Sequence, residues 1–149
     1  MGIRYAHTNI ISENWAQLAR FYQDVFDCTL VPPQRDQSGQ WLEEGTGVKD
    51  ARLSGVHLRL PGHGEDDPTL EIYSYSQMEN KPPPLANRKG IGHLAFSVDD
   101  VAETLKNIMN RGGKALGKVT TREVPQVGQL TFVYATDPEG NIIEIQKWN

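Results

Sequence analysis

Four polar side chains that could bind a divalent metal fall at matching positions in two halves of the sequence. The first half carries His7 and Glu71, and the second half carries His93 and Glu144. Two imidazoles and two carboxylates are a suitable donor set for Zn, Ni, Co, Mn or Fe. An octahedral ion with these four ligands keeps two open positions for vicinal oxygens of a small substrate. The sequence therefore predicts one divalent metal ion held by these four residues.

The match between the halves rests on an internal repeat. Each histidine is followed six residues later by an acidic residue at an expected helix start. Each glutamate lies between two aliphatic residues, with an aromatic residue four positions further on. The residues concerned are Glu13 and Asp99, Leu70-Glu71-Ile72 and Ile143-Glu144-Ile145, and Tyr75 and Trp148. The His-to-Glu spacing is 64 positions (71 − 7) and 51 positions (144 − 93), and the 13-residue excess fits a long loop predicted over 34–50.

Periodicity predicts the elements that position these residues. Expected strands cover residues 3–11, 28–31, 52–60, 69–75, 91–98, 114–124, 129–135 and 142–148. Pro32-Pro33 is expected to end the second strand, and a helical turn is expected over 41–44 within the loop. Pro61 to Pro68 and Asp137 to Asn141 are predicted turns.

Two amphipathic helices are expected, one in each half. The first is capped within Ser12-Glu13-Asn14, and its apolar stripe is Trp15, Leu18, Ala19, Tyr22 and Phe26. The second is capped by Asp99-Asp100 and ends at Gly112-Gly113, with a stripe of Val101, Leu105, Ile108 and Met109.

The elements therefore follow the order βαβββ, linker, βαβββ. We expect one α+β domain over residues 1–149, with module one at 1–78, a linker at 79–89 and module two at 90–149. The linker contains Pro82-Pro83-Pro84, which disfavours both helix and sheet interior.

Strand alternation predicts where the glutamates point. Leu70 and Ile72 face the helices, so Glu71 faces the other side of the sheet, and Glu144 does the same between its aliphatic neighbours. A carboxylate on a half-enclosed surface is costly unless it is paired or coordinated. Two such carboxylates would repel one another unless a cation lay between them. This favours the metal over four separate structural roles.

Composition excludes several other classes of function. The net charge is −4 with a pI of about 5.5, and no basic run exists, so nucleic acid is not an expected partner. No stretch approaches the roughly 20 apolar residues of a membrane span, and the N-terminus lacks the apolar core of a signal peptide. Cys28 is the single cysteine, so no intrachain disulfide forms. We expect Cys28 to be a buried thiol and the protein to be cytoplasmic.

The remaining candidate residues have simpler interpretations. His57 is interpreted as a partly exposed strand residue that could line a pocket, and His63 as a solvated turn residue. Tyr73, Tyr75 and Trp148 could form pocket walls or pack in the core. No Ser-His-Asp or Cys-His arrangement for nucleophilic catalysis stands out.

Four segments resemble those of the vicinal-oxygen-chelate superfamily, which includes glyoxalases, extradiol dioxygenases and bleomycin-resistance proteins. They are 6–10 (AHTNI), 70–72 (LEI), 92–100 (GHLAFSVDD) and 137–145 (DPEGNIIEI). The resemblance covers nearly the whole chain. It implies two βαβββ modules whose curved sheets form an incomplete barrel around the metal. It also implies a small-molecule substrate and a homodimer, with the cleft either within one chain or across two.

The resemblance to glyoxalase I is closest in the metal ligands. It implies that His7, Glu71, His93 and Glu144 bind the metal, that Glu144 removes a carbon-bound proton, and that Glu71 returns it. Two positions depart from glutathione-dependent glyoxalases. Ile11 stands where those enzymes usually carry an arginine, and Ile72-Tyr73-Ser74-Tyr75-Ser76 replaces an Asn-Trp-Gly segment. Both departures argue against glutathione as part of the substrate.

Three other functions occur within the superfamily. An extradiol-type dioxygenase would use Fe(II) on His7, His93 and Glu144, but Glu71 would be a fourth ligand and would close a position that oxygen needs. A bleomycin-resistance-like binder generally lacks the metal ligands. A fosfomycin-modifying enzyme needs a cluster of Lys and Arg, which the expected cleft strands do not carry.

Overall fold

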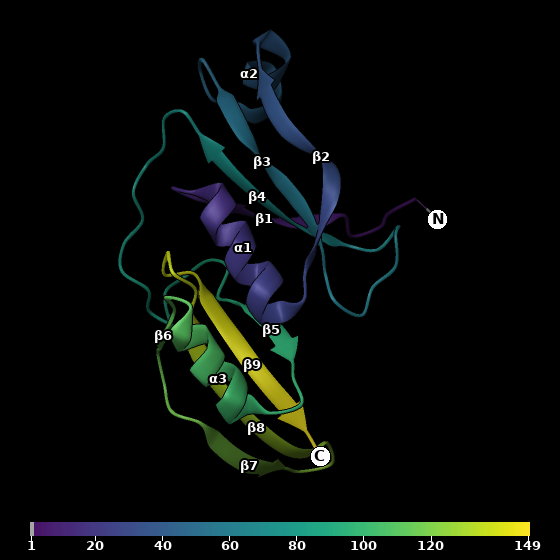
Figure 1. Ribbon diagram of the computed structural model, residues 1–149, viewed down its shortest axis with the longest axis vertical. Coiled ribbons are helices and arrows are strands. Elements are labelled where there is room, and N and C mark those ends of the chain that lie inside the picture. The colour runs from purple at the N-terminus through teal and green to yellow at the C-terminus, as the bar shows by residue number, and fades with distance from the viewer. Residues whose placement is uncertain (1) are drawn as a thin grey trace. The chain divides into compact units, whose positions relative to one another are not determined.

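The computed structural model describes residues 2–149, and Met1 lies outside them. The chain divides into two compact units, the first ending at Lys81 and the second beginning at Pro82. Each unit contains one mixed, open β-sheet and a long helix, so the predicted α+β class is confirmed (Figure 1). Across residues 2–149, no helix has the length and apolar character needed to span a membrane.

The first unit is a four-stranded sheet in the order β1-β4-β3-β2. The strands are β1 (His7–Ile11), β2 (Thr29–Ser38), β3 (Arg52–Arg59) and β4 (Thr69–Tyr75). Strand β1 runs parallel to β4, whereas β3 is antiparallel to both β4 and β2. The histidine strand and the glutamate strand are therefore direct neighbours.

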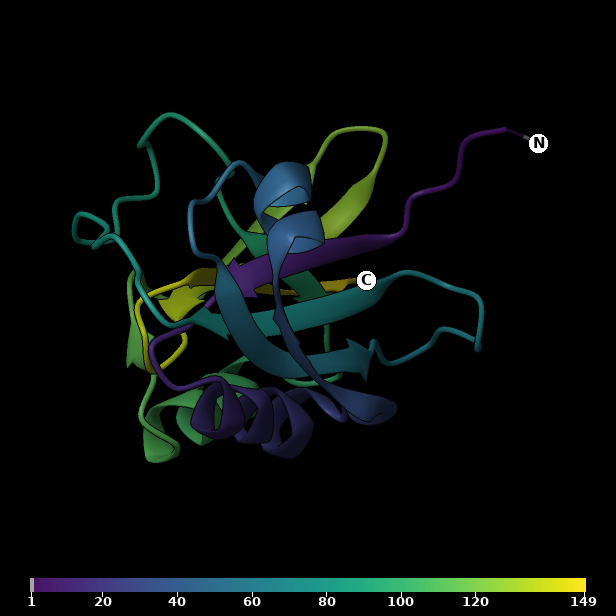
Figure 2. The same cartoon turned by 90° about the horizontal axis from the view of Figure 1, so that it is seen from above.

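Helix α1 (Trp15–Phe26) covers one face of this sheet (Figure 2). The helix begins where the Asn14 side chain accepts a hydrogen bond from the backbone N–H of Gln17, an N-cap within the predicted segment. Its buried side chains include Leu18 and Tyr22, and the buried strand residues Leu58, Leu70 and Ile72 complete the core. Burying each such aliphatic side chain contributes about 1.5–3 kcal/mol, so this packing fixes which face of β4 is left for Glu71.

The first expected strand is shorter than the sequence suggests. Only His7–Ile11 pairs with β4, and residues 2–6 form an exposed stretch that extends away from the sheet (Figures 1 and 2). The β-branched and aromatic residues there fit a strand locally, but the ladder to β4 starts at the His7–Thr69 pair.

The expectation that Pro32-Pro33 ends the second strand is wrong. Strand β2 runs from Thr29 to Ser38 through both prolines, with a register shift between Val31 and Arg35. Proline lacks a backbone N–H, and an edge strand tolerates this where the missing donor would face solvent. Strand β2 is such an edge, and the prolines lie where its pairing with β3 is interrupted.

The expectation of a long loop over 34–50 is also wrong in part. Residues up to Ser38 belong to β2, and the expected helical turn is confirmed as helix α2 (Gln40–Thr46). Leu42 is the buried residue of α2, and it packs with Ala51, Leu53 and Tyr73. The segment therefore builds a small core beside β3 and β4.

The second unit repeats this plan. Its elements are β5 (Leu94–Ser97), α3 (Val101–Asn110), β6 (Lys114–Ala115), β7 (Thr120–Val124), β8 (Gly128–Thr136) and β9 (Ile142–Trp148). The sheet order is β5-β9-β8-β6, with β7 also paired to β8, and β5 is parallel to β9. The histidine-side strand again lies next to the glutamate strand.

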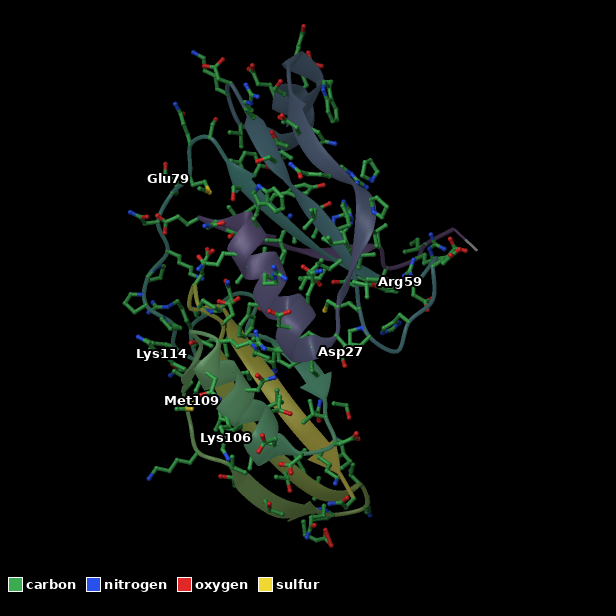
Figure 3. All side chains as sticks on the ribbon, viewed as in Figure 1. Asp27, Arg59, Glu79, Lys106, Met109 and Lys114 are labelled. Carbon is green, nitrogen blue, oxygen red and sulfur yellow. The ribbon has the colours of Figure 1, made fainter. Side chains whose placement is uncertain are left out.

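Three sequence expectations for the second unit need correction. The strand expected at 91–98 covers only Leu94–Ser97, and the strand expected at 114–124 is divided into β6 and β7. The predicted cap is confirmed, because Asp100 accepts from the backbone N–H of Glu103 at 2.9 Å. Met109 does not join the apolar stripe, since its side chain is exposed at 52%, and Figure 3 shows it on α3 near Lys106.

Candidate metal centre

The first histidine–glutamate pair lies on two parallel neighbouring strands. His7 is the first residue of β1 and Glu71 the third residue of β4, and His7 Nε2 is 3.4 Å from Glu71 Oε1. The His7 side chain is 39% exposed and the Glu71 side chain 11% exposed. The pair thus combines a largely enclosed carboxylate with an accessible imidazole.

The second pair has the same geometry. His93 immediately precedes β5, Glu144 lies in β9, and His93 Nε2 is 3.4 Å from Glu144 Oε1. Their side chains are 29% and 16% exposed. The structure therefore forms two His–Glu pairs from the four predicted ligands, one in each unit.

Both pairs suit a metal ion in donor type and separation. Two donors bound to one ion at about 2.0–2.2 Å lie about 3–3.5 Å apart, and both nitrogen–oxygen separations are 3.4 Å. Within residues 2–149, no group of three or more His, Cys, Asp or Glu is arranged to hold a metal ion. Each unit on its own thus offers one His–Glu pair.

His57 contacts the carboxylate of Glu71, although the sequence predicted only a partly exposed strand residue that could line a pocket. It lies on β3 directly across from Glu71, and its Nε2 is 2.8 Å from Glu71 Oε2. The same nitrogen is 3.0 Å from the Tyr73 hydroxyl, and Nδ1 is 3.3 Å from Thr69 Oγ1. The sequence signal was the position of His57 in the strand that precedes the glutamate strand, but the register that pairs the two residues could not be read from it.

Asn9 was also missed as a site residue. It pairs with Glu71 across the β1–β4 ladder, and its Nδ2 donates to Glu71 Oε1 at 2.8 Å. Each oxygen of Glu71 thus has a polar side chain beside it, from the strand on either side. The signal in the sequence was the alternation that places Asn9 on the same face as His7.

The glutamate of the second unit has different strand neighbours. Ala95 and Tyr134 occupy the positions across from Glu144 that Asn9 and His57 occupy across from Glu71. Alanine has no polar side chain, and the Tyr134 ring packs against the His93 ring at a centroid separation of 4.7 Å. The repeat is therefore symmetric in its expected ligands but asymmetric around them.

Tyr73 reaches this network because Gly55 lies beside it. Gly55 pairs with Tyr73 across the β3–β4 ladder, and a Cβ atom on Gly55 would lie 2.6 Å from Tyr73 Cδ1. The tyrosine ring therefore occupies the space of the missing side chain. Its hydroxyl contacts His57 and forms a hydrogen bond with Glu71.

Burial dominates the electrostatics of this cluster. It lowers the pKa of His57, although the negative charge of Glu71 acts in the opposite direction. Burial likewise raises the pKa of Tyr73, and the hydrogen bond to Glu71 raises it further. Both groups are therefore held in their neutral forms, so they act as hydrogen-bonding groups beside the glutamate.

The other candidate residues lie outside the two pairs. His63 Nδ1 is 3.7 Å from Asp67 Oδ2 in the exposed turn, as predicted. Cys28 is 3% exposed and burial raises its pKa to about 12, so the buried-thiol prediction is confirmed. Tyr73 belongs to both the core and the site, whereas the Trp148 indole is partly exposed and donates to Gln146 Oε1.

Known proteins share this fold. The family model for the Glyoxalase/Bleomycin resistance protein/Dioxygenase superfamily matches residues 4–145. Uncharacterized protein YaeR of Escherichia coli (strain K12) is 26% identical over 140 residues, or 93% of this chain and 92% of YaeR. A glyoxalase family protein from Bacillus cereus has a TM-score of 0.76 at 15% identity, covering 98% of this chain and 93% of its own. A glyoxalase I mutant from Zea mays has a TM-score of 0.64 at 21% identity, covering 96% of this chain and 44% of the maize chain.

Proposed function

Because the chain belongs to the Glyoxalase/Bleomycin resistance protein/Dioxygenase superfamily, we propose that it is a divalent-metal-dependent lyase or isomerase of the glyoxalase type. Its substrate is a small molecule with two vicinal oxygens. The observation that supports this proposal is the repeated His–Glu pair, with a nitrogen–oxygen separation of 3.4 Å in both units.

In this proposal His7, Glu71, His93 and Glu144 hold one ion of Ni, Zn, Co, Mn or Fe. The bound ion supplies Lewis-acid polarisation of the substrate oxygens. The two imidazoles and two carboxylates orient the substrate by fixing where those oxygens can sit. A bound cation would also stabilise negative charge that develops on those oxygens.

Proton transfer falls to the glutamates. Glu144 removes the proton from a substrate carbon and passes it to a substrate oxygen; Glu71 takes the proton from that oxygen and returns it to the neighbouring carbon. The surroundings of Glu144 support its choice as base, because the neighbouring strand position is Ala95, which has no polar side chain to engage the carboxylate. A carboxylate without a polar partner at that position is freer to turn towards a substrate carbon, and a general base must come within hydrogen-bond reach of the proton it removes.

Metal content tests the proposal most directly. Elemental mass spectrometry on tag-free protein should find near one Ni, Zn, Co or Mn per chain in the wild type. Glu71→Ala and Glu144→Ala should both lose it. Iron that survives Glu71→Ala would favour the Fe(II) dioxygenase, in which His7, His93 and Glu144 are the ligands. No stoichiometric metal, even after reconstitution, would refute a metalloenzyme and leave a non-enzymatic small-molecule binder.

A homodimer is part of the same proposal, on the basis of the family resemblance. Light scattering should give twice the chain mass. Mixing Glu71→Ala with Glu144→Ala protein then tests whether one site draws its two pairs from one chain or from two. If each site uses the first unit of one chain and the second of its partner, a mixed dimer regains one intact set of ligands. If each site uses one chain, mixing restores no metal binding.

A further inference from the structure

Glu71 is held at both carboxylate oxygens by side chains that are not among the proposed ligands. Asn9 Nδ2 donates to Oε1 at 2.8 Å, and His57 Nε2 lies 2.8 Å from Oε2. Oε1 is also the oxygen that faces His7, at 3.4 Å from its Nε2. Asn9 thus contacts the same oxygen as the proposed ligand His7, and His57 contacts the other oxygen.

The hydrogen-bond chemistry fixes how His57 acts. A carboxylate only accepts hydrogen bonds, so Nε2 of His57 carries the proton that is donated to Glu71 Oε2. Nδ1 then accepts, and the Thr69 hydroxyl at 3.3 Å is its donor. This arrangement locks the tautomer and the plane of the ring, as outer partners do for groups in metal sites.

His57 is itself held in place by packed neighbours. Its side chain is 17% exposed, and its ring packs edge-on against the rings of His7 and Tyr73 at centroid separations of 5.7 and 5.9 Å. Tyr73 is buried against Leu42 and Leu53. The packing of this small core therefore restrains Tyr73, which contacts His57, and His57 in turn restrains the carboxylate of Glu71.

We propose that His57 is a positioning residue: it holds Glu71 by Oε2 and so orients Oε1 as a metal ligand. This inference rests on the proposed metal-dependent function. The inference gives the two glutamates different roles, because Glu144 has Tyr134 and Ala95 at the corresponding ladder positions. Glu71 is then a fixed ligand, and any carboxylate that moves during the reaction is Glu144.

Cobalt binding tests this role without knowledge of the substrate. Co²⁺ affinity and its visible absorption spectrum should be measured for the wild type, His57→Gln and His57→Met. Gln and Met have similar shapes, but only Gln carries a donor for Glu71. We expect His57→Met to bind Co²⁺ about 10- to 100-fold more weakly and to show an altered spectrum, whereas His57→Gln retains most of the affinity. His63→Gln, in the exposed turn, is the matched control and should bind like the wild type.

A double-variant cycle separates positioning from direct coordination. In a Glu71→Ala background, the weak residual binding is titrated with Co²⁺ raised far above the wild-type Kd. There His57→Met should cause no further loss of Co²⁺ affinity, because the residue that His57 positions is gone. Thr69→Val provides a second route that leaves His57 in place but removes the hydroxyl beside Nδ1. It should weaken Co²⁺ binding several-fold. If His57→Met does not fold, Thr69→Val alone tests whether His57 positions Glu71.

The possible results are distinct. Wild-type affinity in both His57→Met and Thr69→Val would overturn the positioning role while leaving the proposed function intact. Equal losses in His57→Gln and His57→Met that persist without Glu71 would also overturn it, since His57 would then act on the metal or on folding directly. Failure of the wild type to bind Co²⁺ would overturn the proposed function, and the positioning role with it.

Discussion

At the scale of single residues, the site depends on a position with no side chain. Gly55 leaves the space that the Tyr73 ring fills, and the Tyr73 hydroxyl then contacts His57. Any side chain at Gly55 would push the ring away from β3 and the hydroxyl away from its partner. The position of the Tyr73 hydroxyl beside His57 and Glu71 thus depends on glycine at position 55.

Gly55→Ala should therefore lower both stability and metal affinity. The new Cβ would overlap the backbone carbonyl oxygen of Ile72 in β4 and would lie 2.6 Å from Tyr73 Cδ1. Because backbone must shift, the cost should be about 3 kcal/mol or more, at the upper end of the usual range for overpacking. Urea unfolding measures the change. Gly45→Ala is the control, because Gly45 lies in α2 with open space around it; there alanine should stabilise by about 0.5–1 kcal/mol. A Gly55→Ala protein as stable as the wild type would contradict the close packing of Gly55 against β4.

Cys28 gives a second prediction at this scale. Its pKa is raised from 9.0 to about 12, first by burial and then by the charge of Asp27. The native thiol should resist iodoacetamide at pH 8, whereas the unfolded chain in guanidinium should react fully, as intact mass shows. The folded state also retains this proton between about pH 9 and 12 while the unfolded state releases it, so this thiol makes stability fall as pH rises through that window. Rapid labelling of native protein would contradict the burial of Cys28.

At the scale of elements, each long helix is fixed by a polar cap and an apolar face. Asp100 caps α3 through the Glu103 N–H, and its backbone carbonyl also accepts from the Thr104 hydroxyl. The helix packs against β8 and β9, so its start helps to set the frame that carries Glu144. Capping and packing contribute separately to the stability of the helix, and a substitution can remove the cap while leaving the packing.

Asp100→Ala should cost about 1 kcal/mol, the usual value for loss of an N-cap. Chemical unfolding of the whole protein measures this change. Asp99→Ala is the matched control: it removes the neighbouring exposed carboxylate but leaves the cap, so it should change stability by less than about 0.5 kcal/mol. Equal effects of the two substitutions would show that the loss comes from charge and not from the cap.

Most of the helices and strands could be predicted from the sequence, but some could not. Strands β3, β4, β8 and β9 and helices α1 and α3 were predicted within one or two residues, because strand alternation or an apolar stripe marks each one. Strand β2 was missed beyond Val31 because Pro32-Pro33 reads as a stop in sequence, and only its edge position makes the prolines tolerable. The expected ligands could be proposed from the repeat. Asn9 and His57 could not, because their contact with Glu71 depends on ladder register.

At the scale of the whole molecule, the repeat gives two units with one His–Glu pair each. A single imidazole and a single carboxylate bind a divalent ion weakly, so the proposed site needs both pairs at once. Metal binding is then linked to the folded state of both units, because the unfolded chain holds no preformed set of four donors. Stability should consequently report metal binding at the level of the entire chain.

Saturation with Co²⁺ should therefore raise the melting temperature. At a free metal concentration of 100 times Kd, linkage adds about 2.7 kcal/mol, which corresponds to roughly 5–11 °C for a protein of this size. Thermal melts followed by circular dichroism, with Co²⁺ or with EDTA, measure the shift. Mg²⁺ is the control, because it prefers an all-oxygen shell and should shift the melt much less.

The same melts on variants locate the ion. Glu144→Ala and Glu71→Ala should each lose most of the Co²⁺ shift, although one substitution lies in each unit, because four donors serve one ion. His63→Gln, outside both pairs, should keep the full shift. If Glu144→Ala kept the shift while Glu71→Ala lost it, the ion would be held by the first unit alone. His57, which lies 2.8 Å from Glu71, would then be the residue to test as a third ligand.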